Sequence, residues 1–527
     1  MHQFYEQWAF KHPYPDDLEH FFETNTHKEL DWFFKQSIQT QEYLDYKLVK
    51  VGDTSRIGNS TYRILTVRNK SDIKGPYSIT AIKNKFPAVE MWYGGFAGKM
   101  EVLFPEGEYD AFRIDKNMDQ PEVNRKNNTV RTSGLLPNTE KFRLQWLGSV
   151  DNPQRTQLFF TPTIGWNNYD KTWLGIAVYN TFLPGKPLSF VWMPAYATGS
   201  KSLTGLGEMN LQLFPNRSFI HRIDITSSAK SFNYANDSFY GAEGNHAYRF
   251  LKFTQQLQLG IRKSSARSPL NQSFTWRNIY LLTELPENYT VEKEYRHQLY
   301  NQLSYVLQSK TVLNPFAFTI VLEEGTDEGE DFYLKTAFDG NCTFTYPRKK
   351  TGFNLRFFLG VMLAAPQEGT AADFHLGPTT GTKDYLFDEV YLGRTESTGF
   401  LSQQVAVTEG GFKMRTDGVQ PELGRSGTWL MAMNAKIPLP FFTPVFAFGD
   451  AGLTAENSSY HSFQFDAGIG FTIIPGIAEV YCPLFFSDDI KLNLNSTSFY
   501  DAWYKRISFT LRINTLHPFK FLRTVAL

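Results

Sequence analysis

The stretch SFQFDAGIGFTI, residues 462–473, decides the fold of this chain. Its odd positions carry Phe, Ala and Ile, and its even positions carry Ser, Gln, Asp, Gly and Thr. The same two-residue alternation runs through residues 249–262 and, broken only by Lys505, through residues 503–514, and it recurs more roughly in 298–310 and 353–363. Because successive side chains of a β-strand point to opposite faces, each stretch predicts a strand with one apolar and one polar face.

These predicted strands have the length and polarity of membrane-crossing strands. A transmembrane strand needs about 9–11 residues with apolar side chains toward lipid, whereas strands of soluble sheets average about 5–6. Aromatic residues gather near strand ends, as membrane interfaces favour: Trp166, Tyr169 and Trp173, and Tyr500, Trp503 and Tyr504. At roughly 23 residues per strand and loop, the sequence predicts a transmembrane antiparallel β-barrel of about 16 strands. A large soluble sandwich or propeller is the alternative.

The residues before the barrel predict two smaller parts. Short alternating segments at 61–69, 77–82 and 99–104, separated by Gly, Pro and Asn, indicate a β-sandwich. Helix is expected before it, with a capping box at residues 26–29, an apolar face formed by Leu30, Phe33, Phe34 and Ile38, and a short helix at 18–22. The expected organisation is therefore mainly β: a short helical segment (1–47), the sandwich and a linker (48–150), and the barrel (151–527).

Charge and hydropathy narrow further the classes of protein to which this chain can belong. The chain has 53 basic and 53 acidic side chains, which argues against nucleic acid as a partner. No uncharged apolar run reaches the roughly 20 residues of a spanning helix. The mean hydropathy of −0.36 does not argue against a membrane, because a barrel averages an apolar outer face with a polar inner one. The first residues lack a secretory signal, so the chain is either cytosolic or continues a longer one.

No catalytic, cofactor-binding or metal-binding residue can be nominated from motifs. None of the ten His is followed by Glu, so the zinc motif HExxH is absent, and phosphate-loop and nucleophile-elbow patterns are absent as well. Six carboxylates within residues 323–331 could bind calcium, although a solvated hairpin tip is favoured. Asp115, Asn117 and Asp119 begin like a calcium loop, but a polar turn is favoured there, and Cys342 and Cys482 are expected to be unrelated thiols.

Several segments resemble one enzyme family. FFETNTHKELDWFFKQ (21–36) and LDYKLVKV (44–51) resemble the end of the aminopeptidase-N-like gluzincin metallopeptidase unit, with Ser37 where the family pattern has Trp. FPEGEYDAFRID (104–115) and PEVNRKNN (121–128) resemble the sandwich of its large Bacteroidetes members. GWNNYDKTWLGIAVYN (165–180), FVWMPAYATGSKSLTG (190–205) and YKRISFTLRINTLHPFKFL (504–522) resemble their outer-membrane barrel.

The resemblance implies the C-terminal part of a cell-surface metallopeptidase in the bacterial outer membrane. The family's zinc motif lies upstream of the helix seen here, so no catalytic residue can be transferred, zinc is implied only for the missing domain, and this chain is expected to be inactive alone. Expected partners are outer-membrane lipid and, for the missing domain, peptide or protein substrates, with the barrel monomeric. Two other hypotheses stay open, a stand-alone pore or uptake channel and a secreted soluble β binding protein.

Overall fold

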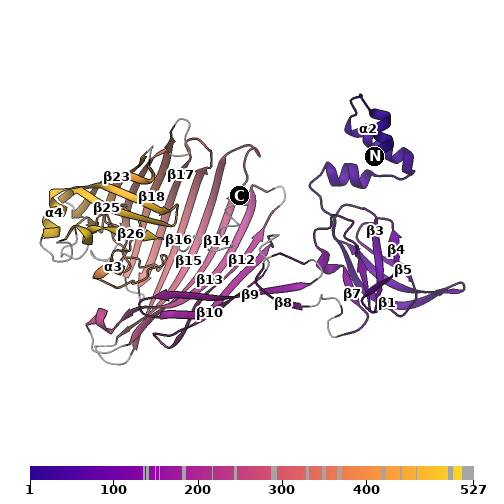
Figure 1. The fold of residues 1–527 in the computed structure, drawn as a ribbon, viewed down its shortest axis with the longest axis horizontal. Helices are drawn as coiled ribbons and strands as arrows, with labels where there is room; N and C mark the ends of the chain where they lie inside the picture. Colours follow the sequence, from indigo (N-terminus) through magenta and orange to yellow (C-terminus); the bar gives the residue numbers. More distant parts are fainter. Residues whose placement is uncertain are drawn as a thin grey trace. The chain divides into compact units, whose positions relative to one another are not determined.

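The computed structural model describes most of residues 1–527 as two compact units. The residues left undescribed are 135–136, 138–141, 149, 153–154, 181–184, 216–217, 242–245, 287–292, 328–330, 347–351, 365–370, 417–422, 440–441, 458–459, 496–501 and 513–527. The first unit comprises Met1–Gln145 and Asp151–Leu158, and the second comprises Trp146–Val150 and Phe159–Leu527 (Figure 1). Each unit is considered by itself.

Three short helices begin the first unit: α1 (His2–Trp8), α2 (Pro15–Thr26) and the π-helix η1 (Trp32–Ile38). At the start of α2, the Tyr14 amide donates to Asp17 Oδ2 (2.8 Å). The predicted capping box at residues 26–29 is wrong, because Thr26 is the last residue of α2 and His27 ends it in a left-handed conformation (φ 53°). The predicted short helix at 18–22 lies inside α2. Only Phe34 of the expected apolar face is buried.

Two antiparallel sheets form the sandwich of the first unit. One has the order β1-β2-β5 and the other β4-β3-β6-β7. The predicted strands at 61–69, 77–82 and 99–104 are confirmed as β2, β3 and β5. The bounds are β1 (Tyr46–Ile57), β2 (Ser60–Asn69), β3 (Tyr77–Lys83), β4 (Phe86–Tyr93), β5 (Lys99–Pro105), β6 (Ala111–Ile114) and β7 (Thr129–Arg131), with a 3-10 turn, η2 (Arg125–Asn127), before β7.

An apolar core fills the space between these sheets. Phe104 packs edge-on against Phe112 (ring centroids 5.3 Å apart), and Tyr46 stacks on Tyr77 (4.5 Å). All four side chains are almost completely buried. Burial of aromatic and aliphatic side chains is the main stabilising contribution in such a domain.

The second unit contains most of a closed β-barrel of 17 described strands. Sixteen run from β9 to β26, omitting β20 and β21, which matches the predicted number, and the short β8 adds one more. The strands are β8 (Phe142–Trp146), β9 (Thr156–Asn167), β10 (Lys171–Tyr179), β11 (Leu188–Ala197), β12 (Ser202–Leu213), β13 (Ile220–Asn236), β14 (Ala247–Ile261), β15 (Leu270–Pro286), β16 (Lys293–Ser309), β17 (Phe316–Asp327), β18 (Asp331–Thr345), β19 (Gly352–Ala364), β22 (Trp429–Leu439), β23 (Phe442–Asn457), β24 (Tyr460–Ile474), β25 (Ala478–Phe486) and β26 (Ser508–Leu511). Outside the connection between β19 and β22, the described helices of this unit are η3 (Asp237–Tyr240), α4 (Asp488–Asn495) and η4 (Trp503–Arg506).

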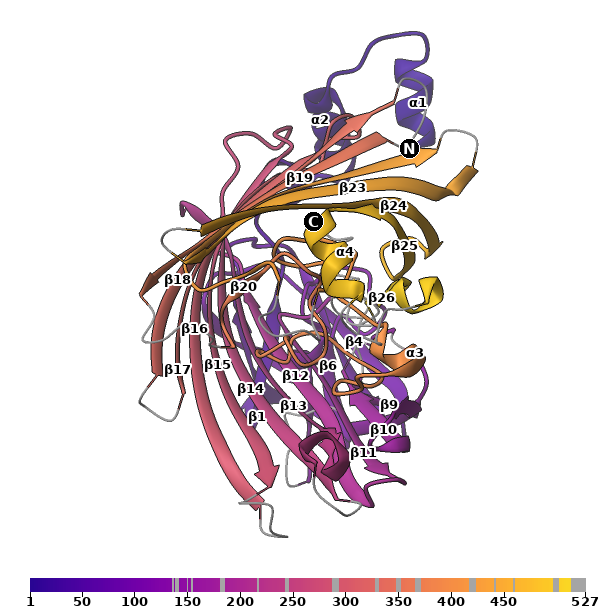
Figure 2. The ribbon, with the colours of Figure 1, turned by 90° about the vertical axis from the view of Figure 1, so that its left-hand side faces the viewer.

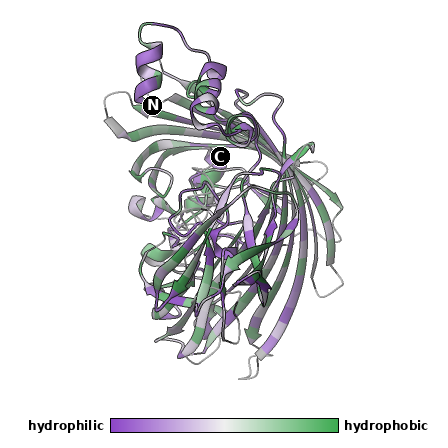
Figure 3. Cartoon of the chain, turned by 90° about the vertical axis from the view of Figure 1, so that its right-hand side faces the viewer, coloured by the Kyte–Doolittle hydropathy of each residue, from purple (hydrophilic) through white to green (hydrophobic). Residues whose placement is uncertain are grey.

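The two faces of the barrel wall follow the predicted alternation (Figure 3). In β24, Phe463 is 56% exposed and Ile469 50%, whereas Gln464 and Asp466 are completely buried. In β14, Leu251 is 40% exposed and Lys252 only 4%. Apolar rows therefore face outward and polar rows face the lumen, which is the arrangement of a membrane barrel. The soluble-sandwich alternative is wrong for this unit, since its apolar rows would pack against another sheet.

The final predicted strand is shorter than expected. Residues 503–506 form η4, and the described strand is only β26 (Ser508–Leu511), paired with β25 over four residues. Within β26 the pattern holds, because Ser508 and Thr510 are buried while Phe509 and Leu511 are partly exposed. No helix in the described ranges is long and apolar enough to cross a membrane.

One connection of the barrel is far longer than the others. Between β19 and β22 lie 64 residues, and their described parts, 371–416 and 423–428, contain β20 (Phe374–His375), α3 (Gly399–Ser402) and β21 (Arg425–Ser426). We call these described parts the plug. Figure 2 shows the orange segment that carries β20 and α3 within the curve of the wall. We call the end of the barrel at which β19 ends and β22 begins the plug end.

Candidate functional site

The plug is the candidate functional site, and its contacts with the wall begin at Asp388. Arg277 of β15 donates to the Asp388 carboxylate through Nη1 (2.9 Å) and through Nη2. Lys252 of β14 contacts the same carboxylate and donates to Leu386 O (2.5 Å). Burial alone would raise the pKa of the Asp388 carboxyl, but the charges of Lys252 and Arg277 hold it well below its usual range. Two cations from the wall therefore fix one anion of the plug.

A second contact centres on Glu323 of β17. Its carboxylate accepts from Tyr333 OH (2.7 Å), from Gln302 Nε2 (2.5 Å) and from the hydroxyl of Tyr385 in the plug. Lys335 Nζ lies 3.6 Å from Glu323 Oε1 and donates to Ala372 O in the plug (3.0 Å). Glu323 is only 4% exposed, so its expected place on a solvated hairpin tip is wrong. Glu324 is exposed and accepts from Asn301 Nδ2 (2.9 Å), and the other four acidic side chains at 327–331 lie outside the described residues.

The later part of the plug contacts three strands that follow it in the sequence, β23, β24 and β26. Lys413 Nζ pairs with Asp450 Oδ2 of β23 (2.8 Å). The amides of Lys413 and Met414 donate to Asp466 Oδ2 of β24 (2.9 and 2.6 Å). Ser508 Oγ of β26 donates to Lys413 O (3.0 Å). All of these side chains are buried, so three strands near the end of the chain hold this segment through charged and backbone groups.

Apolar packing and internal bonds make the plug a folded body. Phe374, Leu376, Phe412 and Met414 of the plug share a buried cluster with side chains of β19 and β22. Arg394 pairs with Asp384 Oδ2 (2.9 Å), with both side chains 7% exposed. The Arg394 guanidinium also donates to backbone carbonyls of the plug. Because its apolar side chains pack against the wall and its buried charges are paired, the plug occupies a defined position in the lumen rather than a range of positions.

A polar cavity of about 400 Å³ remains between plug and wall. Its charged side chains are already paired in part, because Arg356 Nε donates to Asp339 Oδ2 (3.0 Å) and Lys436 Nζ pairs with Glu479 Oε1 (2.5 Å). Other lining residues are Asn341, Asn354, Val407, Lys413, Asn434, Ala435, Phe446, Phe448, Gly476, Ile477, Tyr481, Thr510 and Arg512. Four of its lining side chains are basic and two are acidic, so positive charge exceeds negative charge around the cavity.

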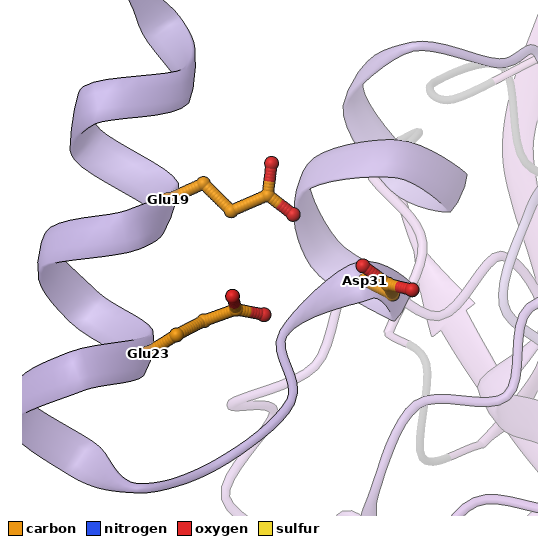
Figure 4. A group of neighbouring side chains, drawn as sticks. All are labelled: Glu19, Glu23 and Asp31. Atoms are coloured by element: carbon orange, nitrogen blue, oxygen red, sulfur yellow. The ribbon is translucent and has the colours of Figure 1, made fainter.

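The first unit contains one group of carboxylates, Glu19, Glu23 and Asp31 (Figure 4). One oxygen from each lies within 4.8 Å of the others. The chain's own Lys35 Nζ lies 2.6 Å from Asp31 Oδ1 and 3.6 Å from Glu19 Oε1, and the Leu30 amide donates to Glu23 Oε1 (2.8 Å). Because these partners already compensate the carboxylates, we assign no metal to them.

The other candidates from the sequence also have local partners. Asp115 begins a polar turn, as favoured: its carboxylate accepts from the Asp119 amide (2.8 Å) and from Arg125 Nη1 (2.7 Å). Cys342 and Cys482 are both free, which confirms that they do not pair. The plug itself was missed by sequence reasoning. The available signal was the long gap in strand alternation between residues 364 and 429.

Comparisons with known proteins give matches of low identity among solved structures. No family model and no curated protein matches the sequence. Among solved structures, CdiB from Acinetobacter baumannii aligns at 11% identity and TM-score 0.32, over 65% of this chain and 61% of CdiB, so this chain spans less than two thirds of that protein. BamA from Haemophilus ducreyi lacking POTRA domains 1-3 aligns at 11% identity and TM-score 0.35, over 64% of this chain and 70% of BamA. The P pilus usher (PapC) translocation pore aligns at 6% identity and TM-score 0.19, over 84% and 82%.

The fold assignment rests on the strand order and the two faces of the wall. A closed antiparallel barrel with an apolar outer face and a polar lumen satisfies every backbone group inside a membrane. The chain therefore forms a membrane β-barrel with lipid against its apolar outer face. The metallopeptidase resemblance stays a prediction.

Proposed function

We propose that this chain anchors a cell-surface zinc metallopeptidase in the outer membrane. In this proposal the barrel fixes the chain in the membrane and the sandwich connects the barrel to a peptidase domain upstream. The observation that supports an anchor over an open channel is the plug, whose ion pairs reach β14, β15 and β23. Removing one partner from a fully buried ion pair such as Lys413–Asp450 costs about 3–5 kcal/mol, and the partly exposed pairs at Asp388 add less, so displacing the whole plug is costly.

The peptidase part of the proposal rests on the resemblance of residues 21–36 and 44–51. Zinc, peptide substrates and the catalytic residues belong to the domain absent from this chain. We expect the purified chain to migrate as a heat-modifiable band in detergent gels and to lack aminopeptidase activity. An in-frame HExxH motif in the DNA immediately upstream would support the proposal, and zinc-dependent turnover by this chain alone would contradict it.

The second candidate is a pore or uptake channel fed by a separate partner. The polar cavity of about 400 Å³ beside the plug favours it, because a lumen that already holds polar space needs less rearrangement to conduct. Planar-bilayer recording of the purified chain separates the two functions. The anchor predicts no steady ion current, whereas a stable current without substitution of the plug would favour the channel.

A further inference from the structure

A second polar pocket, of about 700 Å³, lies at the plug end of the barrel, and two of its lining residues, Asn168 and Tyr169, hydrogen-bond Glu396 and Thr395 of the plug (2.7 and 2.6 Å). Three consecutive hairpins form it: the β9–β10 turn, the β11–β12 turn, and the ends of β13 and β14. Its charged and polar lining includes Lys171, Ser200, Lys201, Asn236, Arg249 and Glu284. The volume is in the range of pockets that bind small molecules or headgroups.

Part of the pocket lining belongs to the outer face of the wall. Arg249 and Asn233 are direct cross-strand partners, so their side chains share one face. Arg249 also has the same strand parity as the outward-facing Leu251 and Phe253, each 40% exposed. Leu203 on β12 is 72% exposed, and Tyr196, its partner on β11, is 50% exposed. Polar residues at the strand end thus follow directly on outward apolar ones, which is the level at which lipid headgroups meet a barrel.

One buried carboxylate holds lining residues of the pocket in place. Asp170 has no exposed surface and accepts hydrogen bonds from the Asn233 amide (3.0 Å), Asn233 Nδ2 (2.5 Å), Ser200 Oγ (2.7 Å) and Asn167 Nδ2 (2.8 Å). These bonds fix two of the hairpins relative to β13. A prearranged pocket loses less conformational entropy when a ligand binds.

The charges around the opening favour an anion. Lys171, Lys201 and Arg249 supply three cations, and Lys171 and Lys201 are exposed. Against them stand the carboxylates of Glu284, which accepts from the Arg249 amide (3.1 Å), and of Asp170, whose oxygens already accept the hydrogen bonds given above. His246 is paired with Asp237 (3.0 Å) and adds no free charge. Ammonium and guanidinium groups are donors that phosphate oxygens prefer.

We propose that this pocket binds the phosphate group of an anionic outer-membrane lipid. The phosphate lies among Lys171, Lys201 and Arg249, and the acyl chains lie along the outward apolar side chains below them. Cationic residues next to a membrane surface attract anionic lipids, and acyl-chain contact supplies apolar burial that free phosphate lacks. The proposal does not depend on the peptidase or the channel.

Native mass spectrometry of the full chain in detergent tests it. The probes are dioctanoyl phosphatidylglycerol, zwitterionic dioctanoyl phosphatidylcholine and inorganic phosphate. We expect saturable binding of phosphatidylglycerol, about tenfold tighter than of phosphatidylcholine or inorganic phosphate. The double variant Lys201→Gln/Arg249→Gln should abolish that preference. The matched control is Lys310→Gln/Arg267→Gln, two exposed cations on connections at the opposite end of the barrel.

Two further measurements keep the outcome clear. The single variant Lys201→Gln changes only an exposed turn residue, should retain the heat-modifiable band, and should weaken phosphatidylglycerol binding about threefold or more. Equal affinity for phosphatidylglycerol and inorganic phosphate would assign the pocket to a free anion and overturn the lipid proposal. Unchanged lipid binding in the double variant, or equal loss in the control, would overturn it as well.

Discussion

In the sandwich, two sheets turn their apolar rows toward each other, whereas the barrel turns its apolar rows outward and encloses polar ones. Both regions use the same two-residue alternation. Phe112 of the sandwich and Asp466 of the barrel are each completely buried, one among aromatic rings and the other among backbone amides and Lys413. Burial alone therefore does not identify an apolar core.

The two regions also treat a buried carboxyl group differently. In the sandwich, burial raises the pKa of Glu122 to about 7, and its hydrogen bonds from Asn128 and the Tyr46 amide (2.9 Å) oppose this only in part. In the plug, the cations of Lys252 and Arg277 outweigh burial at Asp388 and lower its pKa. The sandwich tolerates a carboxyl that is neutral for much of the pH range, while the lumen pairs an ionised one.

The largest expected effect is the loss of apolar packing in the sandwich. Phe112→Ala removes a ring that contacts Phe104 and Tyr109, and we expect a loss of about 3–5 kcal/mol in the stability of this region. Urea-dependent proteolysis of the sandwich in the full chain measures it. Phe86→Ala, on a side chain that is 73% exposed, is the control. Similar resistance of the two variants would contradict an apolar core at Phe112.

The outer face of the barrel should respond to depth in the membrane. Ile469→Arg places a charge in the middle of β24, where we expect a cost of about 2–4 kcal/mol, because an Arg at the bilayer midplane is poorly solvated. Ile473→Arg lies near the end of the same strand and should cost no more than about 1 kcal/mol. The urea midpoint of folding into lipid vesicles measures both. Equal effects would show that this face does not cross a membrane.

Sequence patterns predicted the strands that can be recognised from neighbouring residues alone. Alternation located β2, β3, β5, β14 and β24 and gave a barrel of about 16 strands, because a strand's two faces repeat every two residues. The pattern failed at residues 503–506, where η4 replaces strand.

The plug could not be predicted because its contacts are far apart in the sequence. Asp388 lies 136 residues from Lys252 and 111 from Arg277, so nothing within the local sequence pairs them. The prediction at Glu323 failed for the same reason. Its carboxylate was expected at a solvated hairpin tip, but it is buried and accepts from Tyr385, which is 62 residues away in the sequence. Alternation indicated a polar lumen but not what fills it.

The raised pKa of Glu122 predicts that the stability of the sandwich depends on pH. Because the folded pKa of about 7 exceeds the unfolded value near 4.5, this group's stabilising contribution is complete below about pH 4.5 and is lost as pH rises through 7. We expect a fall of about 2–3 kcal/mol between pH 4 and pH 8. Glu122→Gln should flatten this profile in urea-dependent proteolysis. Glu108→Gln, on a side chain that is 92% exposed, should leave the profile unchanged.

The smallest expected effect is at Asp388, and it tests the lumen side of the comparison. Asp388→Ala leaves the cations of Lys252 and Arg277 without the anion that they share. Their repulsion then favours a state in which the plug has moved away from the wall. The cost should be about 1–2 kcal/mol, below that of a fully buried pair, because the Asp388 side chain is 37% exposed and partly screened by solvent. Since 1.4 kcal/mol corresponds to a factor of ten, brief openings in planar bilayers should become about tenfold more frequent.

Asp388→Glu keeps the charge and should restore closure, and Val390→Ala, which alters an exposed side chain of the plug, is the control. An opening frequency that does not change in Asp388→Ala would mean that apolar packing around Phe374 and Phe412, rather than ion pairing, holds the plug in place.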